Sequence, residues 1–318
     1  MTARELFVLG TASQVPTRQR NHNAYFLRWD REGILFDPGE GTQRQLTLAG
    51  LAVSAITRVC ITHFHGDHCL GLPGIIQRFS LDGAPPVKVY YPASGQVYFE
   101  RLRYASIFAG LETLIPHPIE SGGILDEDDS FILEALPLDH EVECFGYRVR
   151  ERDHLRVRQE RLDELGLKGA LVGELMRNGQ IELNGKTVLR QDVSETRLGQ
   201  SFAFIMDTRP CAGARELAQG ADLLVSESTF LSSEAELASK SGHMTARDAA
   251  ELARDAGARQ LLLTHFSRRY DNSADFVAEA KTIFDNVLAA QEPDAIDPSS
   301  QRHRFAVPSR RENCASQK

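Results

Sequence analysis

The stretch His63-Phe64-His65-Gly66-Asp67-His68 holds more metal-competent side chains than any other part of this 318-residue chain. The apolar run 58–62 precedes it, which predicts a buried strand that ends where these side chains begin. Imidazole nitrogens and carboxylate oxygens are ligands that Zn²⁺ and similar divalent ions prefer. A centre with two metal ions is the natural interpretation. The alternative is a polar loop that is rich in histidine by chance.

Other apolar runs also end at a candidate ligand. The predicted strands are 5–9, 24–29, 33–37, 87–91, 131–136, 202–206, 222–226 and 259–264, with helical patterns such as 246–256 between them. This alternation predicts an α/β fold, in which strands present functional groups at their carboxyl ends. We therefore expect His140, Asp207 and His265 to meet the first motif at one edge. Taken singly, His140 also fits a surface histidine, Asp207 a helix N-cap or turn, and His265 a core histidine.

The number of these side chains matches what two metal ions need. Each Zn²⁺ takes about three protein ligands and a water, so two ions that share one carboxylate need roughly seven protein ligands. The predicted sets are His63, His65 and His140 for one ion, Asp67, His68 and His265 for the other, and Asp207 as the bridge. Such a centre holds a phosphodiester for in-line attack by water. Hydrolysis of a phosphoester, or of a strained amide or thioester, is the predicted chemistry.

Two residues are candidates for proton transfer. His243 lies in the glycine-containing loop 241–245 rather than at a strand end, which suits a mobile proton donor better than a metal ligand. The alternative is a histidine at the start of the helix 246–256, with Thr245 as N-cap. Asp67 can bind metal and also accept a proton from the attacking water.

The composition limits the class of protein. The net charge of −8 argues against a surface that is basic everywhere, so any nucleic-acid partner must meet a local patch. The five cysteines share no CxxC spacing and are typical of thiols in a cytoplasmic protein. No apolar run approaches the roughly 18 residues of a membrane span. We therefore expect a soluble, cytoplasmic protein without a membrane partner.

Residues 151–198 differ from their surroundings. They have mixed charge, several glycines and no strong apolar stripe after Leu175, which predicts an inserted arm rather than a separate domain. Arginines are frequent at the start of this stretch and could form a patch for nucleic acid, although interleaved acids also fit a solvated, salt-bridged face. The remainder of 1–308 is predicted to be one domain, and 309–318 a disordered tail.

Further motifs carry a resemblance to a known family. The ligand pattern is typical of the metallo-β-lactamase superfamily, and the segments 16–21, 36–45, 207–211 and 265–270 narrow the match. In order and spacing, from about residue 6 to 308, the chain resembles the ribonuclease Z family. That resemblance implies a four-layer αβ/βα sandwich with an inserted protruding arm. It also implies two Zn²⁺ per subunit in the sets given above, with Mn²⁺ or other divalent ions as substitutes.

The resemblance implies an activity as well. Members of this family are endoribonucleases that cut precursor tRNA at the 3′ side of the discriminator region, removing the 3′ trailer and leaving a 3′-hydroxyl. Asp67 would accept a proton, His243 would donate one and Glu227 would orient His243. The residues implied in substrate binding are Arg18, Asn21, Arg269 and Thr245. A homodimer is implied too, in which the arm of one subunit grips the tRNA that the other cuts.

Four departures from the family pattern leave the metal ligands untouched. In one, the usual His-Glu-Ala-Thr appears as Ser226-Glu227-Ser228-Thr229, which keeps Glu227 available to orient His243. Arg18 replaces a usual lysine, Ala170-Leu171 replaces the usual Gly-Pro pair of the arm, and Met244 replaces a usual serine. Two other functions stay open at this point. One is a phosphodiesterase or other small-molecule hydrolase of the same superfamily, which the altered arm motivates. The other is a non-catalytic, metal-stabilised RNA-binding protein.

Overall fold

The computed structural model describes residues 4–107, 114–128, 131–292 and 302–304. The predicted tail at 309–318 lies outside these residues. Two compact units are present, and the described part of the chain is divided between them. Unit 1 draws on Met1–Asp126, Leu133–Val149 and Ser201–Lys318, and unit 2 on Glu127–Ile132 and Arg150–Gln200. The insertion predicted at about 151–198 falls within unit 2, and its role as an arm stays a prediction.

The first sheet of unit 1 has seven strands. Their order is β18 (Arg302–Arg304), β1 (Arg4–Gly10), β2 (Ala24–Trp29), β3 (Glu32–Phe36), β4 (Arg58–Cys60), β5 (Val87–Pro92) and β6 (Leu114–Ile119). Strands β1 to β3 pair antiparallel, and β3 to β6 pair parallel. The strands predicted at 5–9, 24–29, 33–37 and 87–91 are confirmed. The strand predicted at 58–62 is shorter, because the chain leaves the sheet after Cys60.

The second sheet also has seven strands. Their order is β17 (Val287–Ala289), β16 (Leu261–Thr264), β15 (Leu223–Glu227), β14 (Ser201–Ile205), β9 (Phe145–Arg150), β8 (Ile132–Pro137) and β7 (Gly123–Glu127). Strands β14 to β17 are parallel. Strands β14, β15 and β16 are wholly buried, as expected for parallel strands that are covered on both faces. The four strands predicted in this half are confirmed.

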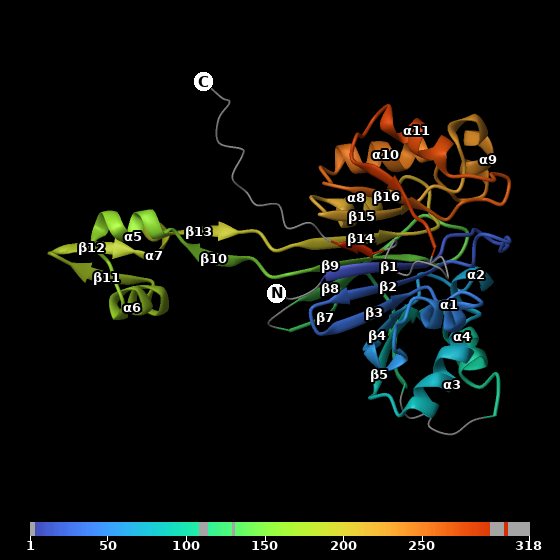
Figure 1. The fold of residues 1–318 in the computed structure, drawn as a ribbon, viewed down its shortest axis with the longest axis horizontal. Helices are drawn as coiled ribbons and strands as arrows, with labels where there is room; N and C mark the ends of the chain where they lie inside the picture. Colours follow the sequence, from blue (N-terminus) through green and yellow to red (C-terminus); the bar gives the residue numbers. More distant parts are fainter. Residues whose placement is uncertain (1–3, 108–113, 129–130, 293–301, 305–318) are drawn as a thin grey trace. The chain divides into compact units, whose positions relative to one another are not determined.

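Helices cover the outer face of each sheet, as Figure 1 shows. On the first sheet these are α1 (Thr42–Leu48), α3 (Leu72–Asp82) and α4 (Gln96–Arg103), with the short α2 (Gly66–Cys69) beside them. On the second sheet they are α8 (Ala212–Ala218), α10 (Ala246–Asp255) and α11 (Ala274–Lys281), with α9 (Ala235–Lys240) nearby. Each set shares a buried apolar cluster with its own sheet.

Aromatic side chains join the inner faces of the two sheets. Phe36 on β3 stacks on Phe204 of β14 with ring centroids 4.7 Å apart. Tyr25 of β2 meets Phe204 edge-on at 5.1 Å, and Phe36 also lies 5.9 Å from Tyr147 of β9. Such pairs add to the stability that burial of their apolar area provides. Unit 1 is therefore a four-layer αβ/βα sandwich, as predicted.

Unit 2 has a small core of its own. Its elements are β10 (His154–Val157), α5 (Gln159–Leu165), α6 (Ala170–Asn178), β11 (Gln180–Leu183), β12 (Lys186–Leu189), α7 (Arg190–Val193) and β13 (Ser194–Arg197). Strands β10 and β13 form one antiparallel pair, and β11 and β12 another. Six buried aliphatic side chains, among them Leu175 and Val188, hold these pieces together. In the described part of the whole chain, no helix has the length and apolarity to cross a membrane.

Candidate metal centre

The seven predicted ligands come together in unit 1. Asp207 and His265 follow the buried strands β14 and β16, with backbone φ of 25° and 60°. A left-handed φ is uncommon outside glycine and marks places where the fold constrains a functional residue. His65 is the N-cap of α2, which carries Asp67 and His68 in its single turn. His63 and His140 follow β4 and β8, so four of the predicted ligands lie shortly after a strand, and the other three lie at or within α2.

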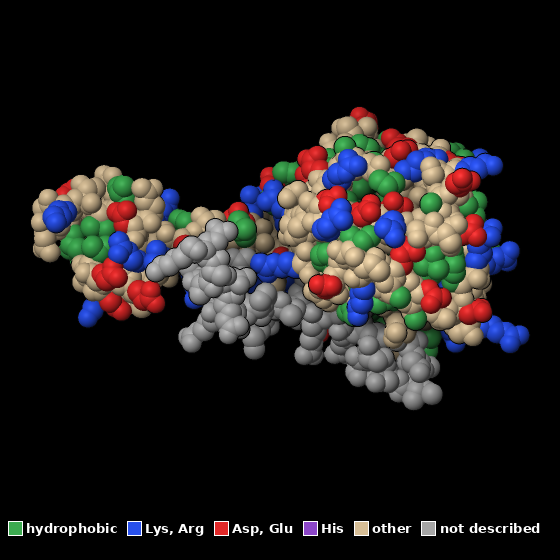
Figure 2. All heavy atoms as spheres, turned by 90° about the horizontal axis from the view of Figure 1, so that it is seen from above, with side chains coloured by type: hydrophobic (Ala, Val, Ile, Leu, Met, Phe, Trp, Pro, Cys, Tyr) green, Lys and Arg blue, Asp and Glu red, His purple; other side chains and the backbone are tan. Residues whose placement is uncertain are grey.

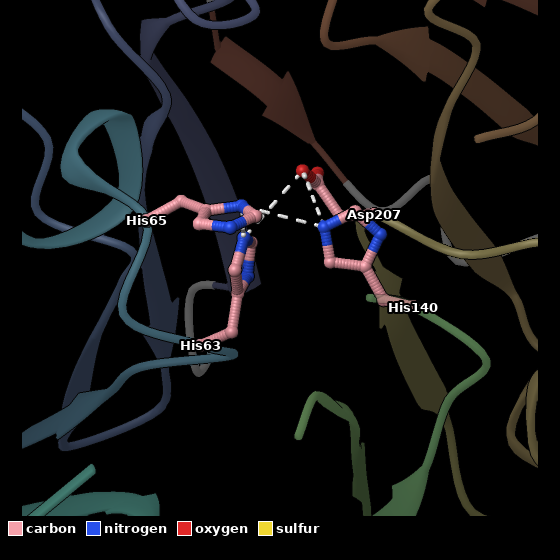
Figure 3. A group of neighbouring side chains, drawn as sticks. All are labelled: His63, His65, His140 and Asp207. Carbon is pink, nitrogen blue, oxygen red and sulfur yellow. Dashed lines mark hydrogen bonds and ion pairs between the residues drawn. The ribbon is translucent and has the colours of Figure 1, made fainter. Parts of the chain in front are cut away.

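The ligand atoms form two neighbouring groups, which are His63, His65, His140 and Asp207, and Asp67, His68 and His265. Within each group the atoms lie within 4.8 Å of one another. Figure 3 shows the first group, with His63 and His65 facing Asp207 and His140 from the opposite side. The distances between facing ring nitrogens are 3.0 Å for His63 and His65 and 3.2 Å for His68 and His265. Ligand nitrogens at the usual Zn–N distance of about 2.0–2.1 Å from one tetrahedral ion also lie roughly this far apart, so the spacing is compatible with metal ligands.

Asp207 faces both groups. Its Oδ2 lies 3.6 Å from Nε2 of His63, and its Oδ1 lies 3.2 Å from Nε2 of His265. Oδ1 is buried and has no hydrogen-bond partner among the described residues. A buried carboxylate oxygen without a partner is costly in a folded protein, and a bound cation would satisfy it. This arrangement is the one expected of a bridging carboxylate.

Hydrogen bonds behind the rings fix which nitrogen faces the centre. The Nδ1 atoms of His68, His140 and His265 contact Asp37 Oδ2 at 2.8 Å, the carbonyl of Gly242 at 3.0 Å and Thr229 Oγ1 at 2.9 Å. In each ring Nδ1 is engaged, so Nε2 is the atom left for an ion. Outer partners of this kind orient metal-binding histidines and increase their basicity. Histidines with a hydrogen-bonded Nδ1 and a free Nε2 fit a site for a divalent metal ion.

The charge of the cage also fits a cation. Asp37, Asp67, Asp207 and Glu227 are all buried around the ligand groups. Burial lowers the pKa of His68, but Asp207, Asp67 and Asp37 raise it well above its usual value. Burial raises the pKa of Asp207, and the imidazoles of His265 and His68 lower it well below its usual range. A cage that holds carboxylates in the ionised form binds metal in competition with protons.

Asp37 has no assigned role in the sequence analysis, yet it supports both groups of ligands. Its Oδ1 accepts the backbone N–H of Thr62 at 2.7 Å, and its Oδ2 accepts the Thr62 hydroxyl at 2.8 Å. The same hydroxyl lies 3.0 Å from Nδ1 of His63, and Oδ2 also accepts from His68. Asp37 is fully buried, with a φ of 45°. Its position is the signal that was available, since Asp37 is the last residue of the strand predicted at 33–37 and follows β3 as observed.

His243 lies beside the centre. It is 6% exposed, and its Nδ1 lies 3.0 Å from Glu227 Oε1, which also accepts the backbone N–H of Thr208 at 2.7 Å. Burial lowers the pKa of His243, but Glu227 and Asp207 raise it to about 9. A pocket of about 400 Å³ is lined by His243, Asp67 and Asp207 together with further residues of the 14–22 and 241–243 segments. The pocket exposes the metal-facing side of the cage.

The residues predicted to bind substrate have different surroundings. Arg18 and Arg269 are exposed. The side-chain amide of Asn21 donates to the carbonyls of His22 and Glu40, at 3.2 and 2.9 Å. Thr245 is buried, and its hydroxyl caps α10 by accepting the N–H of Asp248 at 3.1 Å. The N-cap that the sequence offered as an alternative at this position is therefore present, although His243 still pairs with Glu227.

The loop that carries Arg18 is joined to the C-terminal part of unit 1. The carboxylate of Glu292 accepts the N–H of Thr11 at 2.8 Å and that of Asn21 at 2.7 Å. Arg20 donates to the carbonyl of Tyr270 at 3.0 Å. Burial raises the pKa of Glu292 to about 7. The loops that carry Arg18 and Arg269 are thus fixed to each other within unit 1.

Known proteins are similar to this chain in sequence and in fold. Ribonuclease Z of Nocardia farcinica is 55% identical over 313 residues, which cover 98% of this chain and 100% of that protein. The chain belongs to the ribonuclease Z family. Ribonuclease Z of Thermobifida fusca is 50% identical, and the alignment covers 98% of this chain and 97% of that protein. The family model described as "Metallo-beta-lactamase superfamily" matches residues 17–146, and the one described as "Beta-lactamase superfamily domain" matches residues 188–266.

Solved structures agree with the ribonuclease Z family. Human tRNase Z, short form, has a TM-score of 0.67 and 26% identity, and the alignment covers 91% of this chain and 97% of that one. The metallo-beta-lactamase fold protein YhfI of Bacillus subtilis has a TM-score of 0.67 at 18% identity, which shows the shared fold; that alignment covers 92% of this chain and 98% of the other. The predicted fold and family are confirmed. The family and the clustered histidines and aspartates together indicate that the chain binds divalent metal.

Substitution of Asp37 by asparagine tests the support of the cage. An amide accepts at one atom, where the carboxylate accepts at two. With its oxygen in the Oδ2 position the variant still accepts from the Thr62 hydroxyl and from His68, but its NH₂ group then faces the backbone N–H of Thr62, which it cannot accept. We therefore expect affinity for Zn²⁺ to fall about 10–100-fold. Titration of the metal-free protein against a chromophoric chelator measures this change. Asp82→Asn is the matched control, since Asp82 pairs with Arg78 at the surface of α3. Unchanged Zn²⁺ affinity in Asp37→Asn would contradict the role given to Asp37.

Proposed function

We propose that this protein is a zinc-dependent endoribonuclease that removes the 3′ trailer of precursor tRNA. It would cut at the 3′ side of the discriminator region and leave a 3′-hydroxyl. The observation that carries the proposal is the pair of buried ligand groups bridged by Asp207. The sequence identity to ribonuclease Z proteins supports the choice of substrate. Buried, unpaired thiols at Cys60, Cys69 and Cys144 are consistent with a cytoplasmic location.

Two Zn²⁺ fit the ligand groups, with Mn²⁺ or another divalent ion as a substitute. One set would be His63, His65 and His140, the second Asp67, His68 and His265, and Asp207 would join them. Bound ions supply Lewis acid chemistry and a water that is acidic enough to ionise near neutral pH. The protein's own contribution is to hold seven side chains in fixed directions around one buried space.

Asp67 and His243 are the proposed proton-transfer residues. Asp67 lies 7% exposed at the pocket, where its carboxylate can accept a proton from the attacking water. His243 lines the same pocket, and the Glu227 carboxylate beside Nδ1 leaves Nε2 as the donor to a leaving 3′-oxygen. Glu227 is a positioning residue, because it is fully buried and bonded to His243, Thr208 and Thr229.

Exposed arginines are the proposed contacts for RNA phosphates. Arg18 and Arg269 lie on loops that the Arg20–Tyr270 and Glu292 hydrogen bonds hold together. The hydrogen bonds that Asn21 and Thr245 already make favour an indirect part for these two residues, through the loop of Arg18 and the loop of His243. Basic and acidic side chains are interspersed on the face of unit 1 that Figure 2 shows, which supports local rather than general RNA contact.

Unit 2 is the proposed tRNA-binding arm, which acts in a homodimer. Residues 150–200 carry ten Lys and Arg and nine Asp and Glu, whereas the chain as a whole has a net charge of −8. The segment is therefore nearly neutral and less repulsive to phosphate than the rest of the chain. Its exposed cations include Lys168, Arg177 and Lys186, which lie on or between its short elements. Recognition would depend on the shape and backbone of the tRNA rather than on base sequence.

Cleavage mapping tests the activity directly. We expect the purified protein with Zn²⁺ or Mn²⁺ to cut a trailer-bearing precursor tRNA at a single bond, with a 3′-hydroxyl on the tRNA product. Asp67→Ala should reduce cleavage by about 10²–10⁴-fold while tRNA binding is largely kept. An intact precursor would refute the endonuclease. Equal loss of binding and cleavage in Asp67→Ala would favour a purely structural role for the metal.

A sulfur leaving group tests His243. His243→Ala should lower kcat by about 10²–10⁴-fold with little change in KM, because proton donation matters only in the transition state. In a precursor with a 3′-bridging phosphorothiolate at the cleaved bond, the leaving group is the 3′-sulfur. It leaves as a thiolate, which needs no proton. It should restore most of the rate of His243→Ala and should not restore Asp67→Ala. If the phosphorothiolate rescues neither variant, His243 is not the donor.

Charge substitutions test unit 2 in the full-length chain. Replacing Lys168, Arg177 and Lys186 by Ala should raise KM for precursor tRNA and reduce the dependence of binding on salt concentration, because phosphate contacts release counterions. Replacing Glu174 and Glu195 by Ala is the matched control and should not raise KM. If the cation variant keeps the KM and salt dependence of the wild type, unit 2 does not bind the RNA backbone.

A further inference from the structure

A backbone N–H from a strained loop residue reaches Asp67. Gln14 N donates to Asp67 Oδ2 at 2.7 Å, which is the shortest hydrogen bond to that carboxylate among the described residues. The same oxygen lies 3.4 Å from Nε2 of His68 and 3.5 Å from Nε2 of His265, so it belongs to the second ligand group. Gln14 has a φ of 56°, a left-handed conformation that glycine adopts readily and glutamine does not. The chain therefore has to hold Gln14 in place.

The side chain of His22, which lines the same pocket as Gln14, contacts this residue. Its Nε2 lies 3.2 Å from the carbonyl of Gln14. A carbonyl only accepts, so the Nε2 atom carries the proton of this hydrogen bond. The ring is 6% exposed, and its Nδ1 lies 3.9 Å from Glu40 Oε2 but has no hydrogen-bond partner among the described residues. The one hydrogen bond that the structure gives this buried ring therefore goes to the residue that aims an N–H at Asp67.

The position of His22 is itself fixed by close backbone packing. A Cβ added at Gly10 would lie 1.6 Å from the carbonyl oxygen of His22, and one added at Gly39 would lie 2.7 Å from His22 Cβ. Residue 22 also forms a bridge with Ala12. Only glycine at positions 10 and 39 allows the chain to approach so closely. Close packing thus fixes the backbone of residue 22, from which the imidazole contacts Gln14.

We propose that His22 is a positioning residue for the metal centre. By its hydrogen bond to the carbonyl of Gln14, it keeps this residue left-handed, so that the Gln14 N–H fixes the rotation of the Asp67 carboxylate. This inference rests on the proposed two-metal function and names a residue that the function does not include. Without His22, Gln14 can relax to an ordinary φ, its N–H turns away, and Asp67 Oδ2 loses its orientation toward the second ion.

Metal affinity provides a test that does not depend on RNA cleavage. In the full-length protein, His22→Leu should weaken one of two Zn²⁺ sites about 10–100-fold, as loss of an outer hydrogen bond to a ligand does, and leave the other site unchanged. His22→Gln keeps a donor amide at a similar reach and should recover most of the affinity. With precursor tRNA, kcat of His22→Leu should fall while KM stays near that of the wild type.

Variants at Gln14 keep the proposal testable if His22→Leu fails to fold. The Gln14 side chain is exposed, so substitutions there do not disturb the core. Gln14→Val should weaken the same Zn²⁺ site, because β-branched residues avoid a left-handed φ, whereas Gln14→Asn should keep the affinity. The double variant His22→Leu/Gln14→Val should bind Zn²⁺ as tightly as the weaker of the two single variants, as expected for residues that act through one contact.

The outcomes separate this inference from the proposed function. If His22→Leu binds both Zn²⁺ ions with the affinities of the wild type, His22 is not a positioning residue for the metal centre. Equal weakening in His22→Leu and His22→Gln would also overturn the inference, since packing rather than the hydrogen bond would then matter. If the wild type binds two Zn²⁺ but leaves precursor tRNA intact, the proposed substrate is wrong and the metal-binding result for His22 still stands.

Discussion

The buried carboxylate of Asp37 is the interaction on which the centre depends. It lies at the end of β3, between the strand that leads to His63 and the helix that carries His68, and its oxygens accept from Thr62 and His68. A fully buried charge is tolerated only where donors surround it. Of its donors, His68 faces the second ligand group with Nε2, and the Thr62 hydroxyl contacts Nδ1 of His63. The hydrogen bonds that stabilise the buried Asp37 carboxylate therefore also orient the histidines. The same contacts contribute to the stability of the fold and to the geometry of the site.

Much of this centre could be predicted from the sequence because its ligands obey a local rule. His63, His140, Asp207 and His265 each follow a buried strand, and strand ends on one side of a sandwich meet. The partners behind them obey no such rule. Thr229 supports His265 and Gly242 supports His140 across separations of 36 and 102 residues, so only the folded chain reveals them. Thr245 shows the opposite case, in which a local helix cap was correctly offered as an alternative.

The edges of elements were harder to predict than their cores. The strand expected at 58–62 ends at Cys60, because Thr62 leaves the sheet to bind Asp37. Strands β10 to β13 were not predicted, since each has only four mostly exposed residues, and the polar–apolar alternation in β10 and β11 is too short to identify a strand. Six buried aliphatic side chains hold unit 2, and none of them stands out in a charged, glycine-rich sequence.

The Glu292 carboxylate has a consequence for how the protein is made. Its bonds to Thr11 and Asn21 close loops of 281 and 271 residues, among the longest in the chain. Contacts of such range form late, because the entropy of closing the loop is paid before they stabilise anything. On the ribosome, the loop beside the pocket cannot make these bonds until Glu292 has been synthesised. A nascent chain would thus reach its final pocket geometry only after residue 292 has left the ribosome.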